Sequence, residues 1–185
     1  MNKNKSRDLI AKAFLNQVSL MPLSKITIKS VVEATSLSRR SFYNNFNGIY
    51  DVIVYVEESI DDDIYNKIEE IDVTSIDDPV KKLIEVVPEL IYAKRDQEKI
   101  MYSPNLRGVW GAYLEDKYTD LTMKTVFKNY TSTEIPKKVA CHYFIQSFLY
   151  IVGIWITQPV PEKPEKFKKI FETLMKTSMI ELPEL

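Results

Sequence analysis

A run of hydrogen-bonding side chains lies near the N-terminus of the chain. It comprises Ser38, Arg39, Arg40, Ser41, Tyr43, Asn44 and Asn45. Arginine and asparagine can pair with the edges of DNA bases, and arginine, serine and tyrosine can donate hydrogen bonds to phosphate oxygens. Phe42 and Phe46 lie four residues apart, so on a helix they face one side and leave the polar residues on the others. The run therefore predicts a short helix with a buried aromatic side and a polar face suited to nucleic acid.

Two further elements must position this helix. Thr27 is a good N-cap for a short helix that turns Val31 inward, and Ser38 is a good N-cap for the helix with the polar face. An amphipathic helix over residues 5–20 precedes both, as apolar residues three and four apart indicate. Two short capped helices joined by a tight turn are typical of a helix-turn-helix. The pattern alone leaves open an ordinary helical hairpin without a DNA-binding role.

The charge distribution favours contact with a polyanion at the N-terminal end. The formal net charge is only −1, but residues 1–46 carry eight basic and two acidic side chains. Residues 47–99 carry fifteen acidic and six basic side chains. A basic segment joined to an acidic body is expected when one end meets nucleic acid and the rest stays off it. Chance clustering of charges on a solvated surface is the alternative.

The stretch from residue 27 to 46, TIKSVVEATSLSRRSFYNNF, closely resembles the DNA-binding signature of the tetracycline-repressor (TetR) family. The resemblance has no gaps. The positions that carry it are Thr27, Ile28, Lys29, Val31, Glu33, Ala34, Leu37, Ser38, Arg39, Ser41, Phe42, Tyr43, Asn44, Asn45 and Phe46. It implies an all-α protein of about nine helices. It places a three-helix helix-turn-helix DNA-binding domain at residues 1–48, followed by a larger helical effector-binding and dimerisation domain at residues 49–185.

Some positions depart from the family pattern. Ser36 stands where a turn glycine is usual, Val32 occupies a small core position, and Asn44 and Asn45 replace histidines that often follow the tyrosine. Ile49 replaces a lysine near the start of the fourth helix, which puts one phosphate contact in doubt. The polar face of the third helix is unaffected by these changes.

The resemblance implies a role for each residue of this segment. Thr27, Lys29 and Tyr43 would contact phosphates, and the face formed by Arg39, Arg40, Ser41, Asn44 and Asn45 would read or straddle bases. Each residue also has a simpler interpretation. Thr27 and Ser38 would then only cap helices, Lys29 and the two arginines would be solvated surface, and Tyr43 would pack its ring on the domain.

The rest of the chain is also predicted to be helical. A fourth helix of about 23 residues, roughly 33 Å long, runs from Ile49 to Ile71 and has an acidic outer face of Glu57, Glu58, Asp61, Asp62 and Asp63. A fifth helix opens at Asp78 and Pro79, and Pro88 predicts a kink in it or a later start. Pro104, Gly108 and Gly111 predict an irregular segment over residues 103–111, with helix resuming over residues 110–130.

The last two predicted helices, over residues 136–157 and 164–180, have wide apolar faces. The resemblance implies that they pair with their copies in a homodimer, whereas packing within one subunit is the alternative. It also implies a small, largely apolar or aromatic effector among the middle helices. The candidate lining residues are Tyr92, Met101, Tyr102, Trp110, Tyr113, Tyr118, Phe127, Phe144 and Phe148, although core packing would explain most of them.

The sequence favours neither catalysis nor a cofactor. Cys141 and His142 are adjacent, so on a helix they point about 100° apart, and no further ligands accompany them. A helical enzyme built on consecutive carboxylates at residues 61–63 is disfavoured because such side chains point in different directions. A regulator that binds a partner protein remains an alternative. The single cysteine, the lack of a signal run and the short apolar run at residues 148–156 predict a cytoplasmic protein with no membrane span.

Overall fold

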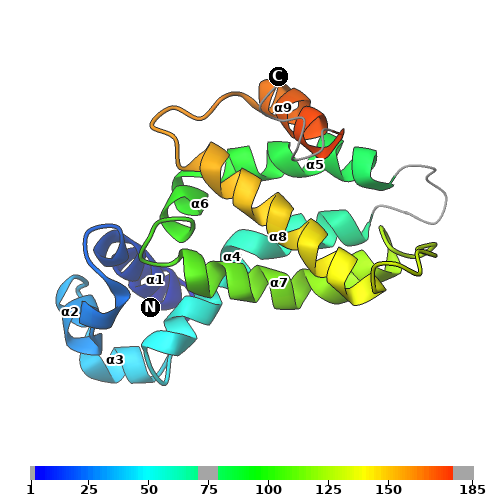
Figure 1. The fold of residues 1–185 in the computed structure, drawn as a ribbon. Helices are drawn as coiled ribbons and strands as arrows, with labels where there is room; N and C mark the ends of the chain where they lie inside the picture. The colour runs from blue at the N-terminus through cyan, green and yellow to red at the C-terminus, as the bar shows by residue number, and fades with distance from the viewer. Residues whose placement is uncertain (1–2, 71–78, 177–185) are drawn as a thin grey trace. The chain divides into compact units, whose positions relative to one another are not determined.

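The computed structural model describes residues 3–70 and 79–176. These residues contain helices and no strand, which confirms the all-α prediction (Figure 1). The α-helices are α1 (Lys3–Val18), α2 (Ile28–Glu33), α3 (Arg39–Tyr43), α4 (Ile49–Glu69), α5 (Pro79–Ala93), α6 (Arg95–Met101), α7 (Arg107–Lys124), α8 (Lys137–Ile156) and α9 (Pro164–Lys176), and a 3₁₀ turn, η1, spans Leu23–Lys25. The predicted N-cap Asp78 and the predicted helix ends at residues 71 and 180 lie outside the described residues.

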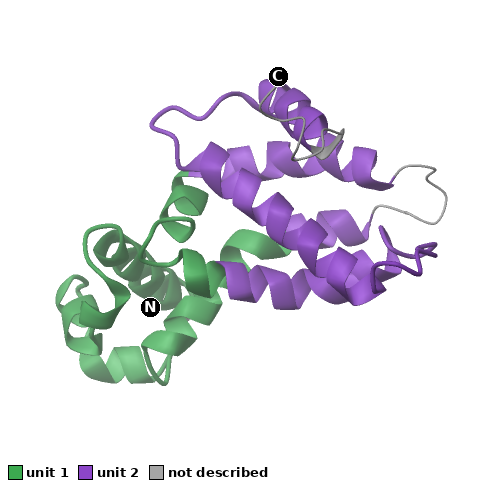
Figure 2. Ribbon diagram, viewed as in Figure 1, with its two compact units in different colours: residues 1–63, 96–110 green, residues 64–95, 111–185 purple. Residues whose placement is uncertain are grey.

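The chain divides into two compact units (Figure 2). Unit 1 comprises residues 1–63 and 96–110, and unit 2 comprises residues 64–95 and 111–185. One boundary falls inside α4 and another inside α7. The functional boundary predicted at residue 48 stays a prediction, since unit 1 holds the helix-turn-helix together with the first part of α4 and nearly all of α6.

Unit 1 is built on a small apolar core. Phe14 and Val18 of α1, Val31 of α2 and Phe42 of α3 are completely buried. α2 contacts both α1 and α3. The segment after α6 joins this core, because the Asn105 side-chain amide donates a hydrogen bond to the carbonyl oxygen of Val18 at 2.8 Å. The end of α1 is therefore tied to a segment almost ninety residues later in the chain.

The apolar stripe predicted for α4 is buried from Val52 to Ile68. The predicted acidic outer face, however, is wrong at two positions, because Glu57 is 3% and Asp61 2% exposed. At Asp61 the physical reason is a second contact, with the segment that follows α6. Tyr102 of that segment lies close enough to Asp61 for the carboxylate charge to raise the phenol pKa. The 3.6-residue pattern showed the main buried stripe but not this second contact.

Unit 2 is anchored by an aromatic stack. The rings of Trp155 and Phe167 lie parallel with centroids 4.0 Å apart, and Tyr92 stacks on Trp155 at 5.9 Å. The indole N–H of Trp155 donates to the carbonyl oxygen of Glu162 at 2.7 Å, which fixes the connection between α8 and α9. This stack joins α5, α8 and α9. Pro88 is buried within α5, which begins at Pro79, so the predicted later start is wrong.

The segment between residues 94 and 125 differs from the prediction. α6 was not predicted, and Gly108 and Gly111 lie inside α7 rather than in an irregular segment. A glycine costs about 1 kcal/mol inside a helix, which tertiary packing can offset. Trp110 and Leu114 supply that packing, since both are buried. α7 also ends at Lys124 instead of Tyr130.

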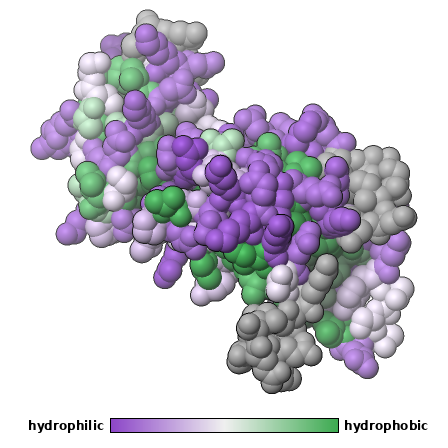
Figure 3. All heavy atoms as spheres, turned by 90° about the horizontal axis from the view of Figure 1, so that it is seen from above, coloured by the Kyte–Doolittle hydropathy of each residue, from purple (hydrophilic) through white to green (hydrophobic). Residues whose placement is uncertain are grey.

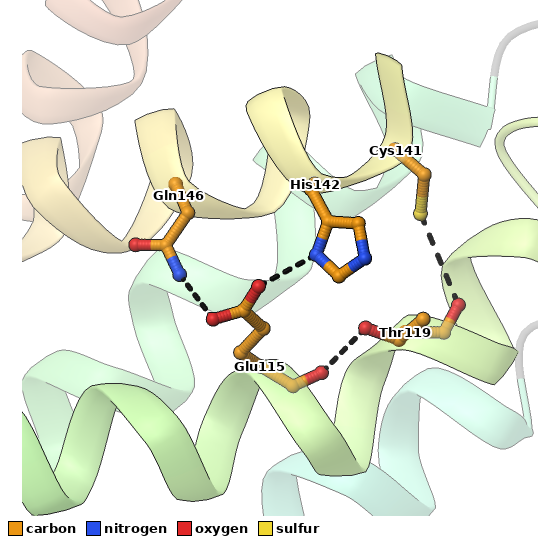
Figure 4. A network of polar contacts seen from close by, with 5 residues as sticks. All are labelled: Glu115, Thr119, Cys141, His142 and Gln146. Atoms are coloured by element: carbon orange, nitrogen blue, oxygen red, sulfur yellow. Dashed lines mark hydrogen bonds and ion pairs between the residues drawn. The ribbon is translucent and has the colours of Figure 1, made fainter. Parts of the chain in front are cut away.

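A polar network joins α7 and α8 through Glu115 (Figure 4). One carboxylate oxygen lies 2.6 Å from Nδ1 of His142, and the other accepts a hydrogen bond from the Gln146 amide at 2.6 Å. Cys141 points instead toward the carbonyl oxygen of Thr119, with Sγ 3.9 Å away. His142 and Cys141 thus face different partners on α7. Among the described residues, no group of three or more histidine, cysteine or acidic residues is placed to hold a metal ion.

α8 leaves much of its apolar surface uncovered. Val139, Tyr143, Tyr150 and Ile154 are between 52% and 72% exposed. The helix is long and apolar enough to cross a membrane by length and composition alone, so its apolar run is longer than the predicted residues 148–156. Core helices of soluble proteins can pass the same test. On the face drawn in Figure 3, hydrophobic patches interrupt a mostly hydrophilic surface.

Candidate nucleic-acid interface

The start of α2 is fixed by a reciprocal capping box. The Thr27 hydroxyl accepts a hydrogen bond from the Ser30 backbone N–H, and the Thr27 backbone N–H donates to the Ser30 hydroxyl, both at 3.1 Å. Gln17 of α1 adds a second tie, because its amide donates to the Ser30 carbonyl oxygen at 2.7 Å and its amide oxygen accepts from the Ser30 hydroxyl at 2.8 Å. α2 is therefore held at a fixed position on α1. The predicted N-cap is confirmed as a structural feature.

α3 begins at its predicted cap. The Ser38 hydroxyl accepts a hydrogen bond from the Ser41 backbone N–H at 3.1 Å. Phe42 is completely buried and Phe46 is 3% exposed, with ring centroids 5.9 Å apart. Tyr43 remains 57% exposed while its ring meets Phe42 edge to face. The two phenylalanines thus hold the helix by one side and leave the rest of it on the surface.

An aromatic and charged cluster that was not predicted from the sequence supports the end of α3. The ring of Phe46 meets the ring of Tyr55 at 5.6 Å, and the Arg7 guanidinium lies 4.2 Å above the Tyr55 ring. The Tyr55 hydroxyl donates to an Asp8 carboxylate oxygen at 2.6 Å. This hydrogen bond, followed by burial, raises the pKa of Tyr55. Arg7 was counted only as a positive charge, but it contributes here as a flat cation on aromatic rings.

The structure leaves most of the predicted DNA-binding residues on the surface. Thr27, Lys29, Ser38, Arg39, Arg40, Tyr43 and Asn44 are exposed, and Ser41 and Asn45 are half-buried. The Asn45 amide donates to the Ser41 carbonyl oxygen at 2.7 Å, so this donor already has a partner within unit 1. Lys29 lies 3.9 Å from Glu33, but both side chains are more than 60% exposed, and such a pair contributes little. Their contacts with DNA stay predictions.

The turn between α2 and α3 accommodates serine at the position where glycine is usual. No described non-glycine residue adopts a positive φ angle, and Ser36 is among the described residues. A left-handed conformation is the usual reason for requiring glycine in a turn. Ser36 therefore imposes no backbone strain, and the departure from the family pattern leaves the two helices in place.

The predicted effector-lining residues are divided between the two units. In unit 1, Met101 and Trp110 are buried, and Tyr102 meets Trp110 edge to face at 6.4 Å. In unit 2, the half-buried residues are Tyr92, Tyr113, Tyr118, Phe127, Phe144 and Phe148. Phe127 and Phe144 pack together at 5.9 Å. Several of the others pack with rings outside the set, as Tyr92 does with Trp155, Tyr118 with Tyr65 and Phe148 with Phe171.

Removing the cap of α3 should loosen that helix without disturbing the core. Ser38→Ala leaves the Ser41 N–H without its partner, and the loss of an N-cap costs about 1 kcal/mol. We expect a lower free energy of unfolding by urea denaturation and faster amide exchange within residues 39–43. Ser36→Ala is the matched control, because Ser36 is exposed and lies outside both helices. Equal losses in the two variants would contradict the capping role.

The comparisons with known proteins agree with this architecture. No family model and no curated protein matches the sequence. A TetR transcriptional regulator from Streptococcus agalactiae 2603V is similar in structure, with a TM-score of 0.65, 15% sequence identity, and 95% of this chain and 96% of that chain covered. The dihydroxyacetone kinase operon activator DhaS is similar with a TM-score of 0.56 and 15% identity, covering 92% of this chain and 94% of the other. The chain therefore has the TetR-type fold that the signature at residues 27–46 predicts.

Proposed function

We propose that the protein is a transcriptional regulator that binds operator DNA through α3, and that it is not an enzyme. The observation that carries this proposal is the short capped helix α3. Two buried phenylalanines hold it on unit 1, while Arg39, Arg40 and Asn44 remain exposed. Side chains of this kind on an inserted helix read base edges in the major groove, and neighbouring donors hold the phosphates. The excess of basic residues before residue 47 supports the same assignment.

The active species would be a homodimer that recognises a near-palindromic operator. The uncovered apolar side chains of α8, together with the 43% exposed Ile170 of α9, form a surface that a second copy would cover. The two copies of α3, one from each subunit, are the reading helices of the dimer. Spaced about 34 Å apart, they would then meet successive major grooves on one side of the duplex. This surface also explains why α8 is so apolar without a membrane, and it fits a cytoplasmic protein.

A small effector would release the protein from its operator, which makes repression the favoured mode. α4 begins in unit 1 and ends in unit 2, so a shift of this helix would reach the support of α3 at Phe46 and Tyr55. Such a shift would alter the spacing of the two reading helices and therefore the fit to both half-sites. The alternative is control by a partner protein instead of a small effector, and activation remains a second mode because the structurally similar DhaS is an operon activator.

Selection of bound duplexes from random DNA tests the proposal. We expect a near-palindromic consensus whose binding weakens steeply with salt, because each phosphate contact releases counterions. Failure to select any specific duplex, with and without cell extract to supply effectors or partners, would contradict DNA recognition. Repression and activation are then separated by reporter expression from a promoter that carries the selected site.

Substitutions in the selected complex should fall into two classes. Lys29→Ala and Tyr43→Phe should weaken binding to all duplexes alike, and Lys29→Ala should reduce the salt slope by about 1. Arg40→Ala and Asn44→Ala should change the preferred sequence, at a cost of about 1–3 kcal/mol for each bidentate base contact. Lys124→Ala is the matched control, since it removes an exposed lysine from unit 2. Uniform weakening by all variants would contradict the assignment of reading residues.

A further inference from the structure

An arginine of α1 is held against two aromatic rings beside the end of α3. The Arg7 guanidinium lies 4.2 Å from the centroid of the Tyr55 ring and 5.2 Å from that of the Phe46 ring. The two rings meet each other at 5.6 Å, so α1 reaches the connection between α3 and α4 at this point. All three residues belong to unit 1. The rings therefore hold a positive charge at a fixed place next to the proposed reading helix.

The guanidinium of Arg7 still has hydrogen bonds to offer. Asp8, the nearest acid in the sequence, is engaged elsewhere, because it accepts a hydrogen bond from the Tyr55 hydroxyl at 2.6 Å. The Nε atom of Arg7 is buried and has no hydrogen-bond partner within residues 3–70 and 79–176. The residue as a whole is only half-buried, so part of it stays open to solvent. A guanidinium has five N–H donors, and stacking on a ring uses none of them.

We infer that Arg7 binds a phosphate of the DNA backbone that passes beside α3. A guanidinium carries its N–H groups in a planar fork, which matches two oxygens of one phosphate. Stacking on Tyr55 holds this plane in one orientation, so little side-chain freedom is lost when the phosphate binds. The same stacking keeps the side chain from extending into the groove toward a base edge. The contact thus positions the protein on the duplex and carries no sequence information.

The dimensions of the duplex place a phosphate within reach of Arg7. The major groove is about 12 Å wide and a helix with its side chains is about 10–12 Å across, so both backbones pass close to a helix seated in the groove. Phe46, which Arg7 contacts, follows the end of α3 at Tyr43 by three residues. Exposed Lys5 lies two residues before Arg7 and adds positive charge to the same end of α1. α1 therefore joins α2 and α3 in holding the duplex.

This inference deepens the proposed function and rests on the entry of α3 into the major groove. Its test uses two duplexes of about 30 base pairs, the selected operator and a duplex of arbitrary sequence. Phosphate contacts act on both, because non-specific binding depends almost entirely on them. Failure to select an operator would contradict the proposed function, and the duplex of arbitrary sequence would still test Arg7. An operator bound by the wild type and by an Arg7 variant with the same salt dependence would overturn the contact alone.

The salt dependence of duplex binding by Arg7→Gln measures the contact. The planar amide can still lie on the rings, but it carries no charge. The slope of log affinity against log salt should become shallower by about 0.9 for each bound subunit. Between about 50 mM and 200 mM salt, the wild type should therefore lose about 3.5-fold more affinity per subunit than Arg7→Gln. Arg7→Lys should retain the wild-type slope, because lysine also neutralises a phosphate.

Arg95→Gln is the matched control. The Arg95 guanidinium lies 5.3 Å from the centroid of the Tyr92 ring, so this variant removes a stacked arginine from unit 2. It should keep the wild-type slope on both duplexes. A role of Arg7 only in supporting α3 would lower the affinity of Arg7→Gln without changing the slope, and this result would overturn the inference. An equal change of slope in Arg95→Gln would overturn it as well.

A second substitution protects the test against loss of the fold. Arg7→Met also removes the charge, and its thioether packs well on aromatic rings, so it should show the same shallower slope as Arg7→Gln. Circular dichroism and urea denaturation of each variant show which of them keep the fold under the conditions of binding. A wild-type slope in a folded Arg7→Met or Arg7→Gln protein would exclude the phosphate contact.

Discussion

Ile154→Glu is expected to convert a dimer into folded monomers. Ile154 is 52% exposed in the single chain, so a charge at this position meets water in the monomer and leaves the fold intact. In a dimer through α8 the same charge would be buried, and the symmetry of the interface would place it there twice. Loss of about 1.5 kcal/mol of apolar burial in each copy weakens association by roughly a hundredfold or more.

Sedimentation at micromolar concentration measures this effect. Leu20→Glu is the matched control, because Leu20 is an 83% exposed apolar residue outside α8 and α9. We expect the wild type and Leu20→Glu to sediment as dimers, and Ile154→Glu to sediment as a monomer with unchanged helicity. Operator affinity should fall together with the dimer, since one reading helix alone contacts one half-site. A monomeric wild type, or a dimeric Ile154→Glu, would exclude α8 as the interface.

The choice of residue is what makes this test informative. Phe171 is an apolar residue of α9, but it is 1% exposed and packs against Phe148 at 5.2 Å. A charge at Phe171 would unfold the subunit whether or not the helix lies at an interface. The exposed side chains of α8 separate the two explanations, and only the structure distinguishes them from the buried ones.

The sequence predicts elements whose cause is local. Thr27 and Ser38 cap their helices through hydrogen bonds to the residue three positions later, and Phe42 and Phe46 meet across one helical turn. Each of these contacts lies within four residues, so the residue types alone indicate it. The helix-turn-helix could therefore be predicted almost to the residue.

Features that depend on distant packing could not be predicted in this way. α6 has little apolar periodicity, and its buried residues, Glu98 and Met101, do not form an apolar stripe that the sequence would reveal. Gly108 was predicted to break the helix. In the structure, Trp110 and Leu114 of α7 are buried, and their tertiary packing, which the local sequence does not reveal, offsets the cost of the glycine. Glu57 and Asp61 were assigned to the surface for the same reason, because the packing that buries them is not local in the sequence; Tyr102, for example, lies near Asp61.

The free energy of unfolding is expected to fall as the pH rises from about 4.5 to about 7. Burial first and then the charge of Glu58 raise the pKa of Glu57 from 4.5 to about 7. Between these values the folded protein keeps a proton that the unfolded chain has released, so stability decreases with increasing pH. A shift of this size corresponds to about 3 kcal/mol in full, and about 2 to 3 kcal/mol of it falls between pH 5 and pH 8.

Urea denaturation at pH 5 and pH 8, at equal protein concentration, isolates the contribution of Glu57. Other groups titrate over this range, so the informative quantity is the difference between wild type and Glu57→Gln. The variant should match the wild type at pH 5, where Glu57 is protonated in the fold, and should be more stable by about 2 to 3 kcal/mol at pH 8. Glu58→Gln should show a much smaller change, because Glu58 is exposed and acts only through its charge on Glu57. Parallel pH profiles for the wild type and Glu57→Gln would contradict the raised pKa of Glu57.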